Sequence, residues 1–129
     1  MADQNLAGTE PMSLKATTTV AGNRFIKQDA TKGFCIQAAA GTDIAIGVSL
    51  VSALANESVP FQSYGKAKIV AGAAVAINAQ VTSDATGRAV TVAAGNTSFG
   101  MAAEAAGAAG DVIEVFLTPL PNLNGPVNP

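Results

Sequence analysis

The sequence contains no histidine, no tryptophan and a single cysteine among its 129 residues. Histidine is the commonest general base and metal ligand, so its absence argues against an enzyme and leaves no Ser-His or Cys-His catalytic site. The lone Cys35 can form neither an internal disulfide nor a cysteine metal cluster, and no D-x-D-x-D-G calcium loop is present. We therefore predict no catalytic residues, no cofactor, no bound metal and no small-molecule substrate.

Charged residues are also scarce, at 12% of the chain with a formal net charge of -2, against ~25% in an average soluble domain. The 7 Lys and Arg residues are scattered and form no basic stripe, which argues against nucleic-acid binding. No run of ~20 apolar residues is present to span a membrane, and the first residues do not resemble a secretory signal. A surface with few charges suits either packing against other subunits or an ordinary compact domain.

The stretch GNTSFGMA has the glycine spacing of a phosphate-binding P-loop, with Gly95 and Gly100 at the two glycine positions. A P-loop continues with a lysine that reaches the phosphates and a hydroxyl that holds magnesium. Here the next residues are Met101 and Ala102, so the side chains that perform this chemistry are missing. The glycines are better explained by architecture than by nucleotide binding.

Other candidates for chemistry also favour structural roles. Asp111 and Glu114 would face opposite sides of a strand and could not flank a common bond. Cys35 lies within an apolar strand pattern and is expected to be a small core residue. We interpret the aromatic residues as core anchors, because they are too sparse to form a stacking platform; they are Phe25, Phe34, Phe61, Tyr64, Phe99 and Phe116.

An internal repeat is the most informative feature of the sequence. Four short landmarks recur in the same order: VAG at Val20 and Val70, DAT at Asp29 and Asp84, AAG at Ala39 and Ala93, and glycine followed by an apolar residue at Gly47 and Gly100. A fifth pair, NESVPFQ and GDVIEVF, matches in its polarity pattern. Alanine-rich sequences produce chance matches, but five landmarks in register favour a duplicated unit.

Both copies are rich in short runs with β-branched or aromatic residues at period two, bounded by Gly, Asn, Asp and Ser. In DVIEVFL, the face formed by Ile113, Val115 and Leu117 is wholly apolar and must be buried. We therefore predict an all-β fold in which two half-repeats, about residues 20–69 and 70–117, pack as one compact sandwich or barrel-like domain.

The two ends of the chain have a different character. Residues 1–19 are polar and irregular, and residues 118–129 are rich in proline and asparagine. We interpret them as an extended N-terminal arm and a C-terminal tail, with frayed termini as the alternative. Apolar residues within them favour a binding role; these are Leu6, Met12, Leu14, Leu120, Leu123 and Val127.

The second half of the sequence resembles the capsid cement, or head decoration, proteins of tailed bacteriophages. The resemblance rests on three motifs, VAGAAVAI, GRAVTVAAG and FGMAAEAAGAAGDVIEV. Family positions match Ala71, Gly72 and Val75, then Gly100, Met101 and Ala102, then Gly110, Asp111, Ile113 and Val115. The Pro/Asn-rich tail departs from the family pattern and leaves the manner of attachment open.

The resemblance implies a structural virion protein, often trimeric, that is made in the host cytoplasm and binds the outer surface of the head. There it would cement neighbouring major capsid subunits against the pressure of packaged DNA. The N-terminal arm is the candidate capsid-binding segment, and its candidate residues are Leu6, Met12, Leu14 and Lys15. An arm of this kind could add a strand to an exposed sheet edge of the capsid protein.

Two alternatives remain open from the sequence alone. The same β-rich scaffold suits another virion component, such as a head fibre base or a tail-tube subunit. A host-surface carbohydrate-binding module is the second alternative, although one tyrosine and no tryptophan provide few aromatic side chains for it. An enzyme is the function with the least support.

Overall fold

The computed structural model describes residues 12–117, which form ten strands and no helix. The strands are β1 (Met12–Ala16), β2 (Phe25–Gln28), β3 (Phe34–Gln37), β4 (Ala45–Ser49), β5 (Ser58–Gln62), β6 (Gly65–Val70), β7 (Gln80–Ser83), β8 (Ala89–Thr91), β9 (Gly100–Ala102) and β10 (Val112–Leu117). The all-β prediction is confirmed. Within these residues there is no helix that could cross a membrane.

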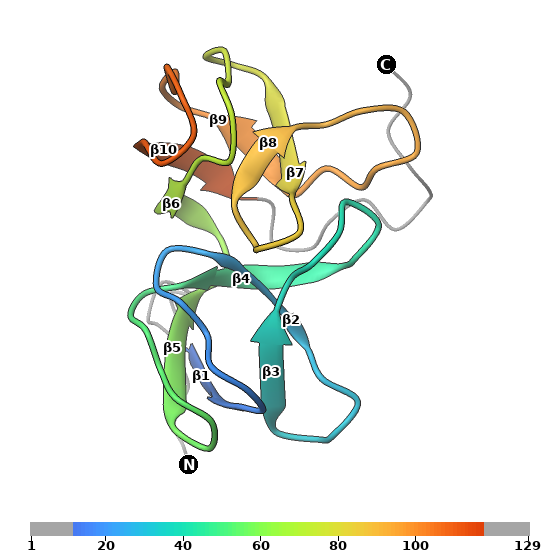
Figure 1. The fold of residues 1–129 in the computed structure, drawn as a ribbon, viewed down its shortest axis with the longest axis vertical. Helices are drawn as coiled ribbons and strands as arrows, with labels where there is room; N and C mark the ends of the chain where they lie inside the picture. The colour runs from blue at the N-terminus through green and yellow to red at the C-terminus, as the bar shows by residue number, and fades with distance from the viewer. Residues whose placement is uncertain (1–11, 118–129) are drawn as a thin grey trace.

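The strands form two units that follow each other along the chain, with β1–β5 in one and β6–β10 in the other (Figure 1). Strands β1–β5 close into a barrel in the order β1-β3-β2-β4-β5. Strand β1 closes this barrel because it pairs in parallel with β3 and antiparallel with β5. The buried residues of the barrel are Ala16, Val20, Ile26, Cys35, Ala53, Val59 and Phe61.

The second unit repeats the strand order of the first. Its sheet runs β6-β10-β9-β7-β8. Read in the opposite direction from β1, the closed barrel runs β1-β5-β4-β2-β3, which is the same order with β6 in the place of β1 and β10 in the place of β5. A parallel bridge between Ala71 and Ala89 stands where the barrel has the parallel pair Ala16 and Cys35. Each buried barrel residue has a buried counterpart here; the counterparts are Ala71, Val75, Val81, Ala89, Ala106, Ile113 and Val115.

Most of the repeated sequence landmarks occupy equivalent positions in the two units. Asp29 and Asp84 open equivalent turns, in which each carboxylate accepts a hydrogen bond from the backbone N–H two residues later. Both turns end at a glycine with positive φ, Gly33 at 85° and Gly87 at 79°, a conformation that costs glycine little.

The VAG landmark does not match in this way. Val20 pairs with Ala53, and the equivalent bridge in the second unit joins Val75 and Ala106. Val70 is instead the last residue of β6. The boundary between the units also differs from the predicted one at residues 69 and 70, because all of β6 pairs with β10 in the second sheet.

The N-terminal segment differs from the predicted arm in its described part. Met12–Ala16 is a barrel strand paired on both sides, and Ala16 is fully buried. Its alternating pattern directs Leu14 and Ala16 toward the barrel core, which explains why the segment is held in the fold. Residues 1–11, which include Leu6, and residues 118–129 lie outside the described part of the chain.

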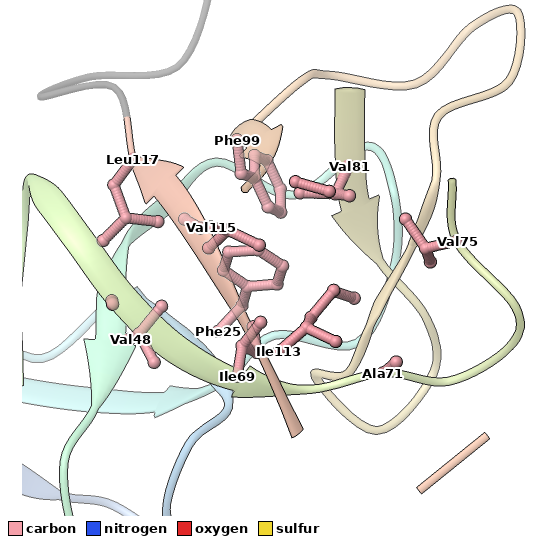
Figure 2. Packing of buried hydrophobic residues seen from close by; sticks show 14 of the residues in the cluster. Phe25, Val48, Ile69, Ala71, Val75, Val81, Phe99, Ile113, Val115 and Leu117 are labelled. Atoms are coloured by element: carbon pink, nitrogen blue, oxygen red, sulfur yellow. The ribbon is translucent and has the colours of Figure 1, made fainter. Parts of the chain in front are cut away.

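One hydrophobic cluster joins the two units. Phe25 and Val48 belong to barrel strands, yet they are fully buried among side chains of the second unit (Figure 2). The ring of Phe25 meets the ring of Phe99 edge to face, with centroids 4.9 Å apart and an interplanar angle of 76°. Backbone hydrogen bonds cross the same junction, from Phe25 N–H to Gly87 and from Val70 N–H to Asn23. The two units are therefore packed together rather than merely connected.

Candidate functional site

The described residues contain no candidate metal centre. No group of three or more His, Cys, Asp or Glu side chains within residues 12–117 is placed to hold a metal ion. Cys35 is buried, and this burial, together with the charge of Asp29, raises the pKa of its thiol. The neutral thiol is thus favoured, as expected for a core residue.

Most of the charged side chains that form an ion pair or a turn hydrogen bond stabilise the fold. Three ion pairs are formed within residues 12–117: Lys27 Nζ with Asp43 at 3.0 Å, Lys66 Nζ with Glu114 at 3.3 Å, and Arg88 Nε with Asp84 at 2.9 Å. Asp111 accepts hydrogen bonds from the backbone N–H groups of the turn before β10, which is a structural role of the kind expected for it.

Asp84 should make the stability of the fold sensitive to acid. Burial acts to raise the pKa of its carboxyl, but hydrogen bonds from the Thr86 and Arg88 N–H groups and the Arg88 guanidinium outweigh burial and lower it below 3.8. A carboxyl with a lowered pKa stabilises the folded state above about pH 4, and this contribution is lost as the pH falls through the folded-state pKa.

We expect Asp84→Asn to lower the free energy of unfolding by about 1.5 kcal/mol at pH 7, because the charged hydrogen bonds are lost. The difference from wild type should shrink as the pH falls from about 4 through the lowered folded-state pKa of the wild-type carboxyl, where this group becomes protonated. Urea unfolding followed from pH 7 to pH 2.5 would measure this. Asp29→Asn, in the equivalent but exposed turn without an arginine partner, is the control and should have a smaller effect. An equal effect of both variants at pH 7 would contradict the prediction.

Two lysines without such partners border an open groove on the barrel. Lys15 of β1 and Lys32 of the β2–β3 turn form no ion pair with any carboxylate of residues 12–117. The groove has a volume of about 470 Å³, and its lining residues are Ser13, Leu14, Lys15, Lys32, Gly33, Phe34 and Ser58. We call it the two-lysine groove.

Strand pairing positions this groove. Lys15 lies beside Phe34 in the parallel pairing of β1 with β3, and its backbone N–H donates to the Gly33 carbonyl at 3.0 Å. This bond ties the turn that carries Lys32 to strand β1. Two ammonium groups next to the apolar surface of Leu14 and Phe34 suit a segment that combines carboxylates with an apolar side chain.

The structure brings together only some of the residues predicted to bind. Leu14 and Lys15 line the two-lysine groove. Met12 is 44% exposed at the start of β1 but does not line the groove, and Leu6 lies outside the described residues. The groove is also lined by Lys32, Phe34 and Ser58, which come from other parts of the barrel and were not among the predicted binding residues. The stretch TKGF held the available signal, a lysine directly before a turn glycine.

Comparison with known proteins identifies the family. A model of the phage cement protein family matches residues 7–117, most of the chain. The chain belongs to the phage cement protein family. The resemblance stated from the sequence is thereby confirmed, and the protein is a structural component of a phage virion.

A solved structure has the same fold. The N base of the head fiber gp8.5 of bacteriophage phi29 superposes with a TM-score of 0.70 at 18% sequence identity, covering 92% of this chain and 98% of that chain. At this identity the likeness concerns the fold. No curated protein matches the sequence.

Proposed function

We propose that this phage cement protein binds the outer surface of the head as a homotrimer and cements neighbouring major capsid subunits. The match of residues 7–117 to the phage cement family carries the proposal. The low charge of the chain supports it, since a protein that spends its working life packed against a shell needs few solvated side chains. A cement protein also works through many modest contacts, which requires no deep pocket.

The two-lysine groove is the proposed contact with the major capsid protein. Lys15 and Lys32 would pair with carboxylates on the shell while Leu14 and Phe34 bury an apolar side chain. A single exposed ion pair contributes only about 0.5 kcal/mol. Three grooves in a trimer would multiply this weak contact through avidity. Leu6 belongs to the same proposed contact, as part of the segment that precedes β1.

Binding to undecorated heads tests this proposal. We expect the double variant Lys15→Glu/Lys32→Glu to bind heads at least about tenfold more weakly, because two attractive charges become repulsive ones. The loss should be larger at low salt, where surface charges are screened less. Quantitative pelleting of protein with heads across a salt series would measure both effects. Heads decorated with wild type should also retain DNA on heating better than heads mixed with the variant.

Lys68→Glu is the matched control. Lys68 is an exposed lysine of β6 with no ion pair among the described residues, and it lies outside the groove. Its substitution changes the net charge in the same direction and should reduce binding only slightly. Because Lys68→Glu changes the net charge by half as much as Lys15→Glu/Lys32→Glu, a loss of binding free energy half as large or more would attribute binding to overall charge and refute the proposed contact.

A head fibre base is a second candidate function, favoured by the fold shared with the N base of the phi29 head fiber. The position of the protein on the particle separates the two functions. A cement function predicts copies of the protein where neighbouring capsid subunits meet. A fibre-base function predicts an elongated fibre that extends outward from the density of the protein. Cryo-electron microscopy of decorated heads would show which arrangement is present.

A further inference from the structure

The second unit carries an exposed and largely apolar row of side chains on its outer face. Phe116 of β10 lies opposite Met101 of β9, and Met101 lies opposite Gln80 of β7. Directly opposed residues in antiparallel strands project from the same face of a sheet. Phe116 is 48% exposed and Met101 is 39% exposed. An open groove of about 360 Å³ is lined by these residues together with Ser98, Gly100 and Leu117. We call Phe116, Met101 and Gln80 the Phe116 row.

The equivalent row on the first unit is covered. Phe25 of β2 lies opposite Val48 of β4, and Val48 lies opposite Gln62 of β5. Strand order and pairing make these positions the counterparts of Gln80, Met101 and Phe116. Phe25 and Val48 are fully buried because the second unit packs over them. In this fold, therefore, the face that the Phe116 row occupies is one against which another β unit packs.

The opposite side of that junction has an uncovered equivalent as well. Strand β6 of the second unit lies against β4, and its residue Ala67 is only 4% exposed in the shared cluster. Ala67 pairs with Val115 as Met12 pairs with Phe61, so Met12 is its counterpart in the first unit. Met12 is 44% exposed. The chain thus presents one half of its internal junction at each end.

We propose that the Phe116 row of one copy docks the Met12 end of a second copy, so that the junction between the two units is repeated between chains. The lining of the groove supports an apolar partner surface such as that of Met12, because it contains no charged residue. In this it differs from the two-lysine groove. A head-to-tail contact of this kind closes into a ring when its rotation permits. The inference rests on the proposed self-association, and it assigns Met12 to the contact between copies rather than to the capsid.

Sedimentation equilibrium of the full chain over a concentration series tests the proposal. Met101→Ser/Phe116→Ser should weaken self-association by about thirtyfold or more, as expected when an apolar anchor is removed from an interface. Met12→Ser should weaken it as well, because it removes the other half of the contact. Val112→Ser is the matched control: Val112 is 52% exposed on the same outer face of β10 but does not line the groove. Circular dichroism would verify that each variant is folded.

Three results would overturn the inference. These are a wild-type chain that stays monomeric at every concentration, an association that Met101→Ser/Phe116→Ser does not weaken, and an equal loss with Val112→Ser. Head binding by the same variants separates this outcome from failure of the cement function. A monomer that still binds heads would overturn only the contact between copies. An oligomer that does not bind heads would overturn the cement function alone. A variant that stays associated but no longer binds heads would assign the Phe116 row to the shell.

Discussion

Phe25→Ala is expected to lower the free energy of unfolding by about 4 kcal/mol. Phe25 is fully buried although it belongs to a barrel strand, and it meets Phe99 of the second unit edge to face at 4.9 Å. Its removal would leave a cavity at the junction and expose apolar surface of both units. Urea denaturation at pH 7 would measure the loss.

Phe61→Ala provides the matched control for this prediction. Phe61 is also buried, but it lies in the barrel cluster away from the junction. Both variants should lose stability, whereas only Phe25→Ala should loosen the contact between the units. Amide hydrogen exchange distinguishes them: in Phe25→Ala, protection should fall first at the N–H groups that cross the junction, such as that of Val70. A loss below about 1 kcal/mol for Phe25→Ala would show that the units do not depend on this contact.

Local patterns in the sequence were enough to predict the all-β class and several of the strands, although not β1. In β10 the alternation places Ile113, Val115 and Leu117 on the buried face, as predicted for DVIEVFL, and leaves Val112 and Phe116 exposed. This works because the side-chain period of a strand is two residues wherever the strand lies. Turn residues are local signals for the same reason, since a positive φ is required at a single position such as that of Gly33.

Burial across the junction could not be predicted in this way, because it depends on partners that are distant in the sequence. Phe25 and Phe116 were both interpreted as core anchors, yet one is fully buried and the other is 48% exposed. The difference arises because the second unit covers the first one's row and the described residues leave its own row uncovered. Residues 12–16 were likewise predicted to be part of an arm, since their partner strand β5 lies more than forty positions further along the chain.

The two-lysine groove illustrates the same limit for the candidate site. Leu14 and Lys15 were selected because they are an apolar and a basic residue in one polar segment. Lys32 and Phe34 reach the groove only through the parallel pairing of β1 with β3, and a parallel pairing has no signature in a short stretch of sequence. The sequence thus predicted part of one wall of the site but not the other.

Gly100→Ala is expected to destabilise the fold by about 3 kcal/mol, because the added methyl group has no room. A Cβ atom at Gly100 would overlap the backbone carbonyl oxygen of Phe116 on the neighbouring strand. A backbone atom inside a paired sheet cannot move aside as a flexible side chain can. The equivalent Gly47 makes the same close approach to the carbonyl oxygen of Gln62, so the repeated glycine serves strand contact rather than phosphate binding.

Thermal and urea unfolding of Gly100→Ala beside Gly107→Ala would test this explanation. Gly107 has no positive φ, and its nearest neighbour to an added Cβ is the Asp111 carboxylate at 3.5 Å, an ordinary contact distance. Gly107→Ala should therefore be close to neutral. Because both variants restrict the unfolded chain similarly, the difference between their stabilities reports the close approach in the folded state. Gly100 also lines the groove of the Phe116 row. Gly100→Ala should therefore weaken self-association as well, in proportion to the fraction of the protein that it unfolds. A Gly100→Ala protein as stable as wild type would mean that β9 and β10 can separate without cost, which contradicts the close approach that the structure shows.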